Sequence, residues 1–448
     1  MSISSVGEHI DDRPEEGIFR VRRDVFSDPE LFELEMKHVF GKTWVFLGLE
    51  SQIRKPNDFL STWIGTTPVL VMRDAKSRIG AFVNVCPHKG AVVAQSESGS
   101  TKYHVCPYHG WAFDCAGKNI NIKDESSGAY PSAFQQESHD LKPVARVGVF
   151  EGLVFGSLSE DVPSLDDFLG DLRPYIELAM QQGAQGMEVI PGRAAYTFRG
   201  NWKLQMDNGL DAYHLTSTHS SFMDVLAKRR SGDGYSAARQ FDWDKRLSQE
   251  MGVMAFKHGH AANWMNQAEV EKRPIFPVID EVRARLGNTK ADWMLKGRSL
   301  TVFPNMQIAD QTSLNLRTFR PISVNLTEMR VYCLAPIGEA PNRREWRLRQ
   351  FEDFFNACGL ATPDDTVTYE MVQRGCSADN KTYLQGYYRG LGTLQPGASS
   401  DSLGEVGVFP AYSQHGAFDC SFETALHAHY REWRRLMEQG LGMDGAAK

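Results

Sequence analysis

Two short loops of nearly the same composition constrain this chain more than any other feature. CPHKG (86–90) and CPYHG (106–110) each contain one cysteine, one histidine, one proline and one glycine. Seventeen residues separate the first histidine from the second cysteine, which is about the length of two short strands with SESGSTK (96–102) as their turn. Such a hairpin would bring four side chains together at one end of a small sheet: Cys86, His88, Cys106 and His109.

These four residues allow three interpretations. A cysteine or histidine taken singly is usually just packed or exposed, but that is a poor account of four in paired loops. Two Cys and two His also suit tetrahedral zinc, although zinc modules commonly place both cysteines in one knuckle and both histidines in the other. One Cys and one His per loop better fit a [2Fe–2S] cluster with two cysteines on one iron and two histidines on the other. The spacing resembles the Rieske cluster-binding motif.

Composition narrows the class of protein further. The 448 residues carry a net charge of −7 without any basic block, which argues against nucleic acid and anionic membranes as partners. The N-terminus is polar and acidic, unlike a signal or transit peptide, and the apolar stretch 147–158 is too short to span a bilayer. We therefore expect a cytoplasmic protein, in which seven scattered cysteines are unlikely to form a disulfide framework.

Local patterns along the chain predict a mixture of strands and helices. Residues 29–40 have helical spacing, and 43–161 alternate short apolar runs with turns, which is typical of a small antiparallel β domain. A linker at 159–168 leads into a helix with Ser164 as its N-cap. The patterns further predict a strand at 194–205 with a helix in the next fifteen residues, a less regular region at 228–295, three strands at 300–311, 313–322 and 328–337, and amphipathic helices at 342–357 and 423–439.

A second group of metal-binding residues lies in NWKLQMDNGLDAYHLTSTH (201–219). On an ideal helix His214 and His219 would point about 140° apart, so the helix must bulge or end between them if both are to bind one metal. Asp211, three residues before His214, could hydrogen-bond the far ring nitrogen and fix its tautomer. Alone, the HxxxxH pattern is weak, because such residues usually lie on a polar helix surface.

With the cluster loops, this segment resembles the large subunit of a Rieske non-haem iron aromatic-ring-hydroxylating oxygenase, most closely the benzoate, toluate and anthranilate branch. The resemblance covers nearly the whole chain and includes FELEMKHVF, SHDLKPVARV, VFGSLSEDVPSL, ANWM and RQFEDFFNACGLATPDD. It implies an α+β protein: a helical arm at 1–40 that packs on the catalytic domain, an all-β Rieske domain at 41–160, and a catalytic domain of the helix-grip, START-like type at 161–448. In that domain an antiparallel sheet packs against long helices.

The resemblance also implies the ligands of a mononuclear Fe(II). His214 and His219 match the two histidine ligands, and the carboxylate should come from ATPDD (361–365). Thr362 and Pro363 form a good helix start that holds both acids rigidly, so physical arguments do not choose between Asp364 and Asp365. The family pattern favours Asp365. Asn208 is expected near the iron, and Leu210, Leu215, His260 and Asn305 are further candidates for the pocket.

In the family, the aspartate at the position of Asp211 connects the two metal centres across a subunit interface. It would join His214 to His109 of the next chain, which implies a ring of three large subunits (α3, or α3β3 with a small β subunit). Electrons would come from NADH through a flavin and iron–sulfur reductase, directly or by way of a ferredoxin. Asp211 and Asn208 are thus the residues expected to serve catalysis.

The implied reaction is cis-dihydroxylation of a benzoate-like aromatic carboxylate by O₂, possible substrates being benzoate, anthranilate or a substituted benzoate. Monohydroxylation, as in salicylate hydroxylases, is the alternative within the class. Outside it, the chain could be a zinc-stabilised binding protein without enzymatic activity, or an electron carrier. The sequence also departs from the family, with Lys89 where arginine is more usual, Asp207 where glutamate is usual, and THSSF (218–222) where benzoate members carry an aromatic residue.

Overall fold

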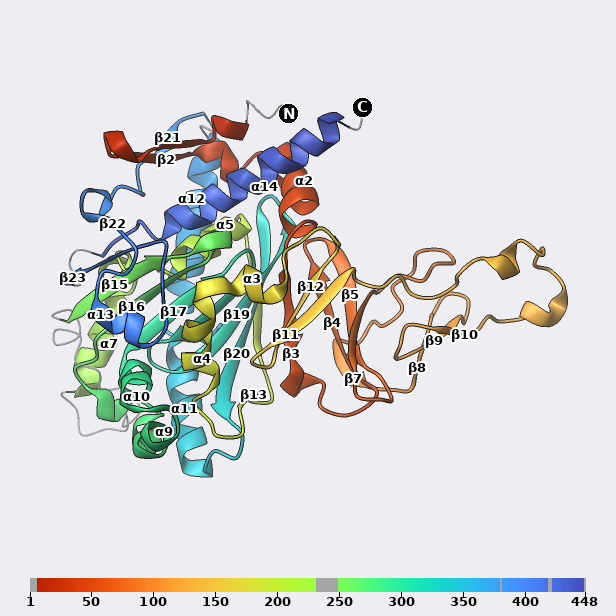
Figure 1. The fold of residues 1–448 in the computed structure, drawn as a ribbon, viewed down its shortest axis with the longest axis horizontal. Coiled ribbons are helices and arrows are strands. Elements are labelled where there is room, and N and C mark those ends of the chain that lie inside the picture. Colours follow the sequence, from red (N-terminus) through yellow and green to blue (C-terminus); the bar gives the residue numbers. More distant parts are fainter. Residues whose placement is uncertain (1–5, 231–248, 379–380, 418–420, 447–448) are drawn as a thin grey trace. The chain divides into compact units, whose positions relative to one another are not determined.

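The chain divides into two compact units. The smaller is Phe40–Val162, and the larger combines Met1–Val39 with Pro163–Lys448. The computed structural model describes residues 6–230, 249–378, 381–417 and 421–446 (Figure 1). Each unit is described below by itself.

The smaller unit contains three antiparallel sheets of short strands (Figure 1). Their strand orders are β6-β5-β4-β7, β11-β12-β3 and β10-β9-β8. The bounds are β3 Val45–Leu49, β4 Asp58–Ile64, β5 Thr67–Arg73, β6 Ile79–Val83, β7 Ser98–Ser100, β8 Tyr103–Val105, β9 Ala112–Asp114, β10 Asn119–Asn121, β11 Arg146–Phe150 and β12 Leu153–Ser157. The prediction of an all-β domain in this part of the chain is confirmed.

The two cysteine loops meet in this unit, but not through the predicted hairpin. β7, which lies within the expected turn 96–102, pairs with β4, whereas β8 pairs with β9. The chain between the loops therefore passes from one sheet to another instead of folding back on itself. Pairing partners far along the sequence decided this, and the local turn signal at 96–102 could not reveal them.

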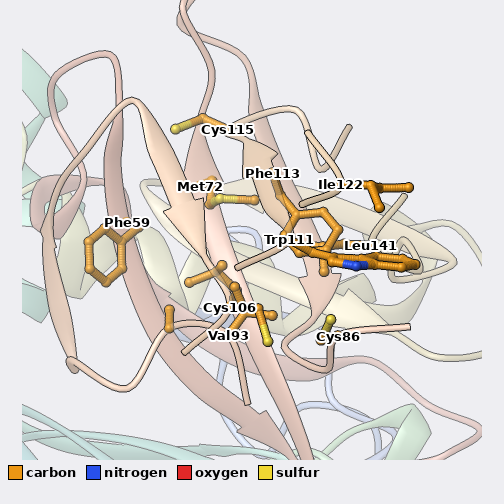
Figure 2. Close-up of a cluster of buried hydrophobic side chains, with 12 residues drawn as sticks. Phe59, Met72, Cys86, Val93, Cys106, Trp111, Phe113, Cys115, Ile122 and Leu141 are labelled. Atoms are coloured by element: carbon orange, nitrogen blue, oxygen red, sulfur yellow. The ribbon is translucent and has the colours of Figure 1, made fainter. Parts of the chain in front are cut away.

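A hydrophobic cluster surrounds the two cysteines of these loops. Cys86 and Cys106 are 1% and 2% exposed and belong to the same cluster as Trp111, Phe113 and Leu141. Figure 2 shows both cysteines on the same side of this cluster, near the Trp111 ring. Burial of these apolar side chains fixes the base of each loop and keeps water away from the sulfur atoms.

The larger unit is built on a ten-stranded antiparallel sheet (Figure 1). Its order is β13-β20-β19-β18-β17-β16-β15-β23-β22, and β14 also pairs with β20. The bounds are β13 Met187–Val189, β14 Ala194–Phe198, β15 Glu250–Ala255, β16 Ala261–Met265, β17 Gly297–Val302, β18 Met306–Asp310, β19 Leu314–Ser323, β20 Leu326–Pro336, β22 Gln395–Pro396 and β23 Tyr412–Ala417. With the long helices beside it, this sheet confirms the predicted α+β class.

Helices pack on this sheet from several parts of the chain. α5 and α11 contact β19, α12 contacts β14, and α14 contacts β15 and β16. The bounds are α3 Leu165–Leu169, α4 Arg173–Met180, α5 Trp202–Asn208, α6 Leu215–Thr218, α7 Ser220–Arg230, α9 Ile279–Leu286, α10 Asn288–Leu295, α11 Pro341–Phe354, α12 Thr362–Ala378, α13 Asp401–Glu405 and α14 Leu426–Ala446. The Ser164 side chain caps α3 as predicted, because its Oγ accepts from the Asp167 amide at 3.1 Å.

The N-terminal arm of this unit is not purely helical. It contains β1 (Ile10–Arg13) and β2 (Ile18–Arg22), which form a three-stranded sheet with β21 (Tyr383–Leu384), before α2 (Pro29–Glu35). From α2, the fully buried Glu35 accepts hydrogen bonds from Trp202 Nε1 and Trp433 Nε1, both at 2.8 Å. Its carboxylate also pairs with Lys203 Nζ at 2.5 Å. One buried charge therefore ties α2 to α5 and α14.

Three local predictions need correction. Residues 194–205 are not one strand, because β14 ends at Phe198 and α5 begins at Trp202. The single strand predicted at 300–311 is two strands, β17 and β18, joined by a turn with a cis bond before Pro304. The stretch 228–295 lies partly outside the described residues, and its described part contains β15 and β16 rather than irregular chain. Among the described residues, no helix is both long and apolar enough to cross a membrane.

Candidate active site

The segment 201–219 forms two short helices, whereas the sequence predicted a strand to residue 205 and one helix over the next fifteen residues. The Asn201 side chain accepts from the Lys203 amide at 3.1 Å and starts α5, which ends at Asn208. A turn follows and leads into the one-turn helix α6. His214 precedes α6 directly, and His219 ends it with non-helical angles (φ −101°, ψ 26°). The predicted helix end between the two histidines is confirmed, and their ring centroids lie 5.2 Å apart.

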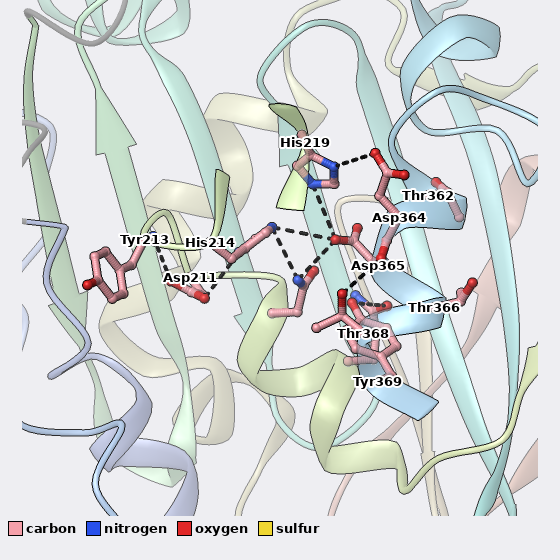
Figure 3. A network of polar contacts seen from close by, with 12 residues as sticks. Asp211, Tyr213, His214, His219, Thr362, Asp364, Asp365, Thr366, Thr368 and Tyr369 are labelled. Carbon is pink, nitrogen blue, oxygen red and sulfur yellow. Dashed lines mark hydrogen bonds and ion pairs between the residues drawn. The ribbon is translucent and has the colours of Figure 1, made fainter. Parts of the chain in front are cut away.

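His214 and His219 converge on one carboxylate oxygen from a distant helix. Asp365 Oδ1 lies 3.2 Å from His219 Nε2 and 3.6 Å from His214 Nε2 (Figure 3). Among the described residues, these three form the one group of metal-ligating side chains whose ligand atoms all lie within 4.8 Å of one another. Two imidazoles and one carboxylate on one side of a site are the ligand set of non-haem Fe(II) oxygenases, which leaves positions open for substrates.

Asp364 lies beside the same group but faces a different atom. Its Oδ2 is 3.5 Å from His219 Nδ1, the ring nitrogen that points away from Asp365, and Ser221 Oγ donates to this oxygen at 3.3 Å. Both acids lie in the first turn of α12, as the helix-start pattern predicted. Asp365 therefore has the geometry of a metal ligand, whereas Asp364 lies at ion-pair distance from the outer nitrogen of His219 without a hydrogen bond to it.

His214 is oriented in a similar way by Asp211. Asp211 Oδ2 lies 3.1 Å from His214 Nδ1, which leaves Nε2 for a metal (Figure 3). Burial lowers the pKa of His214, but the Asp211 carboxylate outweighs burial and the net pKa is raised. The contact comes from a turn and not from a shared helix face, because Asp211 lies between α5 and α6.

Asn208 completes the polar surroundings of the site. Its Nδ2 lies 3.3 Å from His214 Nε2 and 3.4 Å from Asp365 Oδ1. The amide thus occupies the space between two of the three candidate ligands and can donate to a group bound there. Asn208 is held in place because it is the last residue of α5, whose Gln205 is fixed to Gln307 of β18 at 2.9 Å.

A pocket opens at these residues. His214, His219 and Asp365 form part of its wall, together with Asn208 and Leu215. Apolar walls come from other elements, including Phe354 of α11 and Ala309 of β18. Its mixed polar and apolar lining suits a small aromatic molecule beside the metal ligands.

In the smaller unit, the two cysteine loops have the same backbone structure. The Cys86 amide donates to the Ala91 carbonyl and the Gly90 amide to the Cys86 carbonyl, at 2.8 and 3.0 Å. The second loop repeats both bonds at the same distances: Cys106 to Trp111, and Gly110 to Cys106. Both glycines have positive φ (76° and 74°), which L side chains rarely adopt.

The side chains of these loops fit a dinuclear cluster. The rings of His88 and His109 lie with centroids 4.4 Å apart, and each has a buried Nδ1 atom without a hydrogen-bond partner among the described residues. Buried polar atoms normally find a partner, so these orphaned nitrogens are free for a metal. Burial raises the pKa of the Cys86 thiol, so a bound cation is needed to hold it as a thiolate.

Comparison with known protein families identifies the domain that contains the two cysteine loops and the domain that contains His214, His219 and Asp365. Residues 43–138 match the Rieske [2Fe-2S] domain, and residues 187–439 match the family described as ring hydroxylating alpha subunit (catalytic domain). The chain belongs to the ring-hydroxylating alpha-subunit family. It is therefore an oxidoreductase of the Rieske aromatic-ring-hydroxylating dioxygenase type, with a [2Fe–2S] cluster and mononuclear iron as its cofactors.

Three curated members of this family are similar over most of their length. Toluate 1,2-dioxygenase subunit alpha of Pseudomonas putida is 39% identical over 84% of this chain and 83% of its own. The 2-halobenzoate 1,2-dioxygenase large subunit of Burkholderia cepacia is 36% identical over 97% and 93%. The anthranilate 1,2-dioxygenase large subunit of Acinetobacter baylyi is 34% identical over 96% and 92%. Naphthalene 1,2-dioxygenase from Rhodococcus sp. shares the fold, with a TM-score of 0.79 at 24% identity over 93% of this chain and 94% of that one.

Within this family member, the four loop residues are not arranged as a site for one ion. Among the described residues, only His214, His219 and Asp365 have three metal-ligating atoms that all lie within 4.8 Å of one another. No three of the loop residues Cys86, His88, Cys106 and His109 meet this distance. A tetrahedral zinc site would bring its ligands that close, whereas a cluster with two irons spreads them. The matches to the Rieske [2Fe-2S] domain and to the ring-hydroxylating catalytic domain show that the zinc-stabilised binding protein is the wrong alternative.

Several pocket residues expected from the sequence lie elsewhere in this alpha subunit. Asn208 and Leu215 line the pocket, but Leu210, His260 and Asn305 are not among its lining residues. His260 is fully buried and bridges the Phe168 carbonyl and the Phe303 amide at 2.8 and 3.1 Å. Burial lowers its pKa to about 3, so it is a neutral histidine of the core.

Two of the positions at which this sequence departs from the family, Asp207 and Ser221 of THSSF (218–222), lie beside the site and outside the pocket lining. Asp207 faces away from the pocket, where its Oδ2 accepts from Tyr387 and Tyr430 at 3.0 and 2.7 Å. Ser221, in THSSF, donates to Asp364 instead of contributing a pocket wall. The substitutions at these two positions therefore affect the supports of the site, and neither residue reaches the pocket itself.

Sequence reasoning missed Arg317, which lines the pocket from β19. A signal was present, since Asn315 and Arg317 alternate with Leu314 and Leu316 in a strand that was predicted. This alternation places two polar side chains on one face of a buried strand. Which face looked onto a pocket could not be read from the strand alone.

Proposed function

We propose that this chain is the large subunit of an oxygenase that cis-dihydroxylates a benzoate-like aromatic carboxylate. One observation carries the proposal: the His214, His219 and Asp365 group lies at a pocket in a chain 34–39% identical to toluate, 2-halobenzoate and anthranilate 1,2-dioxygenase large subunits. In the reaction, the arene, O₂, two electrons and two protons give one cis-dihydrodiol, and NADH supplies the electrons.

The proposed cofactor sites use the residues described above. His214, His219 and Asp365 would hold the mononuclear iron, and Cys86, His88, Cys106 and His109 would hold the cluster. When bound, the cluster supplies electrons and the mononuclear iron supplies O₂ activation. The proposed domains are 41–160 for the cluster and 161–448 for the iron, with 1–40 as an arm of the latter, and the two compact units support this division.

The protein's own residues would prepare the site for this chemistry. Asp211 holds His214 by a hydrogen bond, with Nε2 directed at the ligand group, whereas Asp364 makes only a longer ion-pair contact of 3.5 Å with His219 Nδ1. Asn208 Nδ2 can donate a hydrogen bond to a ligand at the site. The apolar walls at Phe354 and Ala309 exclude water from the space beside the histidines.

The proposed assembly is a trimer of large subunits, α3 or α3β3 with a small subunit. In it, Asp211 would bridge His214 and His109 of a neighbouring chain and carry the electron between the two centres. A flavin and iron–sulfur reductase, acting directly or through a ferredoxin, would deliver electrons from NADH. The relatives' names as alpha or large subunits support an assembly of several chains.

The deciding experiment is a turnover with ¹⁸O₂. The chain is co-expressed with a small subunit and a reductase of the benzoate type, and benzoate is supplied with NADH. Two labelled atoms in a cis-dihydrodiol are expected by mass spectrometry. One labelled atom in a phenol would instead indicate a monohydroxylase, and no product with any aromatic acid would refute the proposed substrate class.

A further inference from the structure

A guanidinium without a carboxylate partner lines the pocket. Arg317, on β19, is half-buried and shares the pocket wall with His214, His219 and Asp365. Among the described lining residues it is the one lysine or arginine. No carboxylate of a described residue lies within 4.0 Å of it, although Asp211 and Asp365 also line the pocket.

Five other buried or half-buried arginines of this unit are neutralised within the protein. Each of the following makes a salt bridge of 4.0 Å or less to an aspartate or glutamate: Arg273 and Arg298 to Asp310, Arg320 to Glu328, Arg344 to Glu188, and Arg347 to Glu339. Removing a charge from water is costly unless it is paired. Arg317 differs from these five arginines, and because it also lines the pocket its guanidinium suits an anion from outside the chain.

The protein fixes the Arg317 guanidinium through its Nε atom and leaves the two Nη atoms available to a ligand. Its Nε donates to Asn315 Oδ1 at 3.3 Å, and its Cζ lies 4.5 Å from the centre of the Phe355 ring. Asn315 is fully buried and is itself fixed, because its Nδ2 donates to the carbonyls of Ala309 and Ser313 at 3.2 and 3.3 Å. The two Nη atoms make no hydrogen bond to a described residue.

We propose that Arg317 binds the carboxylate of the substrate and so determines the preference for aromatic acids over uncharged arenes. This inference rests on the proposed function and names the group that recognises its substrate. A planar pair of Nη donors matches the two oxygens of a carboxylate. Arg317 is the one lysine or arginine among the described lining residues, so the carboxylate points to Arg317 and the ring lies toward the histidines.

The test compares a charged substrate with an uncharged one of the same shape. Benzoate and benzamide are titrated by calorimetry into the metal-loaded oxygenase, and product formation is followed with the reductase present. Wild type should bind benzoate at least roughly 10-fold more tightly than benzamide, because a neutral amide leaves the guanidinium desolvated and poorly paired. Equal affinities would overturn the inference without any mutation.

Arg317→Gln provides the direct perturbation, with Arg320→Gln as the matched control on the same strand. Arg320 pairs with Glu328 and is not among the pocket-lining residues. In Arg317→Gln, KM and Kd for benzoate should rise roughly 10- to 100-fold, and those for benzamide should change less than about 3-fold. Arg320→Gln should leave the benzoate to benzamide ratio as in wild type.

The outcomes separate this inference from the proposed function. If wild type converts benzoate and Arg317→Gln keeps its benzoate to benzamide ratio, the inference is wrong and the proposed function stands. If wild type converts no aromatic acid, the proposed function fails. Folding is checked by the visible spectrum of the cluster, and Arg317→Lys is the second variant. It keeps the charge but loses the planar fork, so its benzoate affinity should fall between wild type and Arg317→Gln, and a loss equal for both ligands would overturn the inference.

Discussion

Replacing the two neighbouring acids of α12 one at a time should weaken binding of the mononuclear iron to very different extents. Asp365 Oδ1 lies within 3.6 Å of the Nε2 atoms of both His214 and His219, whereas Asp364 contacts His219 through Nδ1. Asp365→Asn removes the one anionic member of a three-ligand set. Asp364→Asn removes a group that orients a ligand, a change that typically weakens metal binding roughly 10- to 100-fold.

The magnitudes are therefore distinguishable. Asp364→Asn should weaken Fe(II) binding by about 10-fold, near the lower limit, since its contact is long at 3.5 Å and Ser221 shares the carboxylate. That corresponds to about 1.4 kcal/mol. Asp365→Asn should weaken Fe(II) binding by more than roughly 100-fold, so the purified variant should lack the mononuclear iron.

The cluster provides an internal standard for this assay. Anaerobically purified protein is analysed for iron and acid-labile sulfide, and wild type should contain about three irons for about two sulfides. Asp365→Asn should contain about two irons for the same sulfide, and Asp364→Asn should return to about three when Fe(II) is added in excess. If Asp364→Asn lost its iron while Asp365→Asn kept it, the assignment of the two acids would be reversed.

Three further changes test the supports of the site. Asp211→Asn should reduce turnover at least roughly 10-fold with both cofactors bound, because His214 loses its orienting carboxylate and the proposed electron route loses its bridge. Glu35→Gln should destabilise the larger unit by roughly 3–5 kcal/mol in chemical unfolding, since it leaves the buried Lys203 uncompensated. Burial raises the pKa of Asp207 to about 7, so the folded state binds a proton that the unfolded state has lost above pH ~4. Relative to Asp207→Asn, the unfolding free energy of wild type should fall as the pH rises from about 4 to 7.

Each of these predictions has a result that contradicts it. Normal turnover of Asp211→Asn with both metals present would exclude the proposed electron route. For the buried pair, Glu33→Gln on the exposed face of the same helix is the control, and it should change stability by less than about 0.5 kcal/mol. An equal loss of unfolding free energy in Glu35→Gln and Glu33→Gln would mean that the unpaired Lys203 charge is not the cause of the destabilisation. If wild type and Asp207→Asn had parallel pH profiles of stability, Asp207 would not titrate in that window.

The cluster loops could be predicted because their determinants are local. The Cys and His residues, the stiff prolines and the glycines with positive φ lie within five residues in each loop, and the ligand types alone favour iron and sulfur chemistry. The same holds for His214 and His219, whose spacing already required a break between them. The path between the loops was predicted wrongly, because it depends on β7 pairing with β4, far away in sequence.

The sequence by itself thus determined which chemistry the chain carries: a Rieske motif, a histidine pair, and a helix start bearing two acids. The tertiary structure decided which acid faces which nitrogen and which side chain faces the pocket. Asp365 and Arg317 line the same pocket as His214 because α12 packs on α6 and β19 packs on α5 through long-range contacts and strand register. Those contacts arise from burial of surfaces more than a hundred residues apart, and no local pattern in either segment encodes its partner.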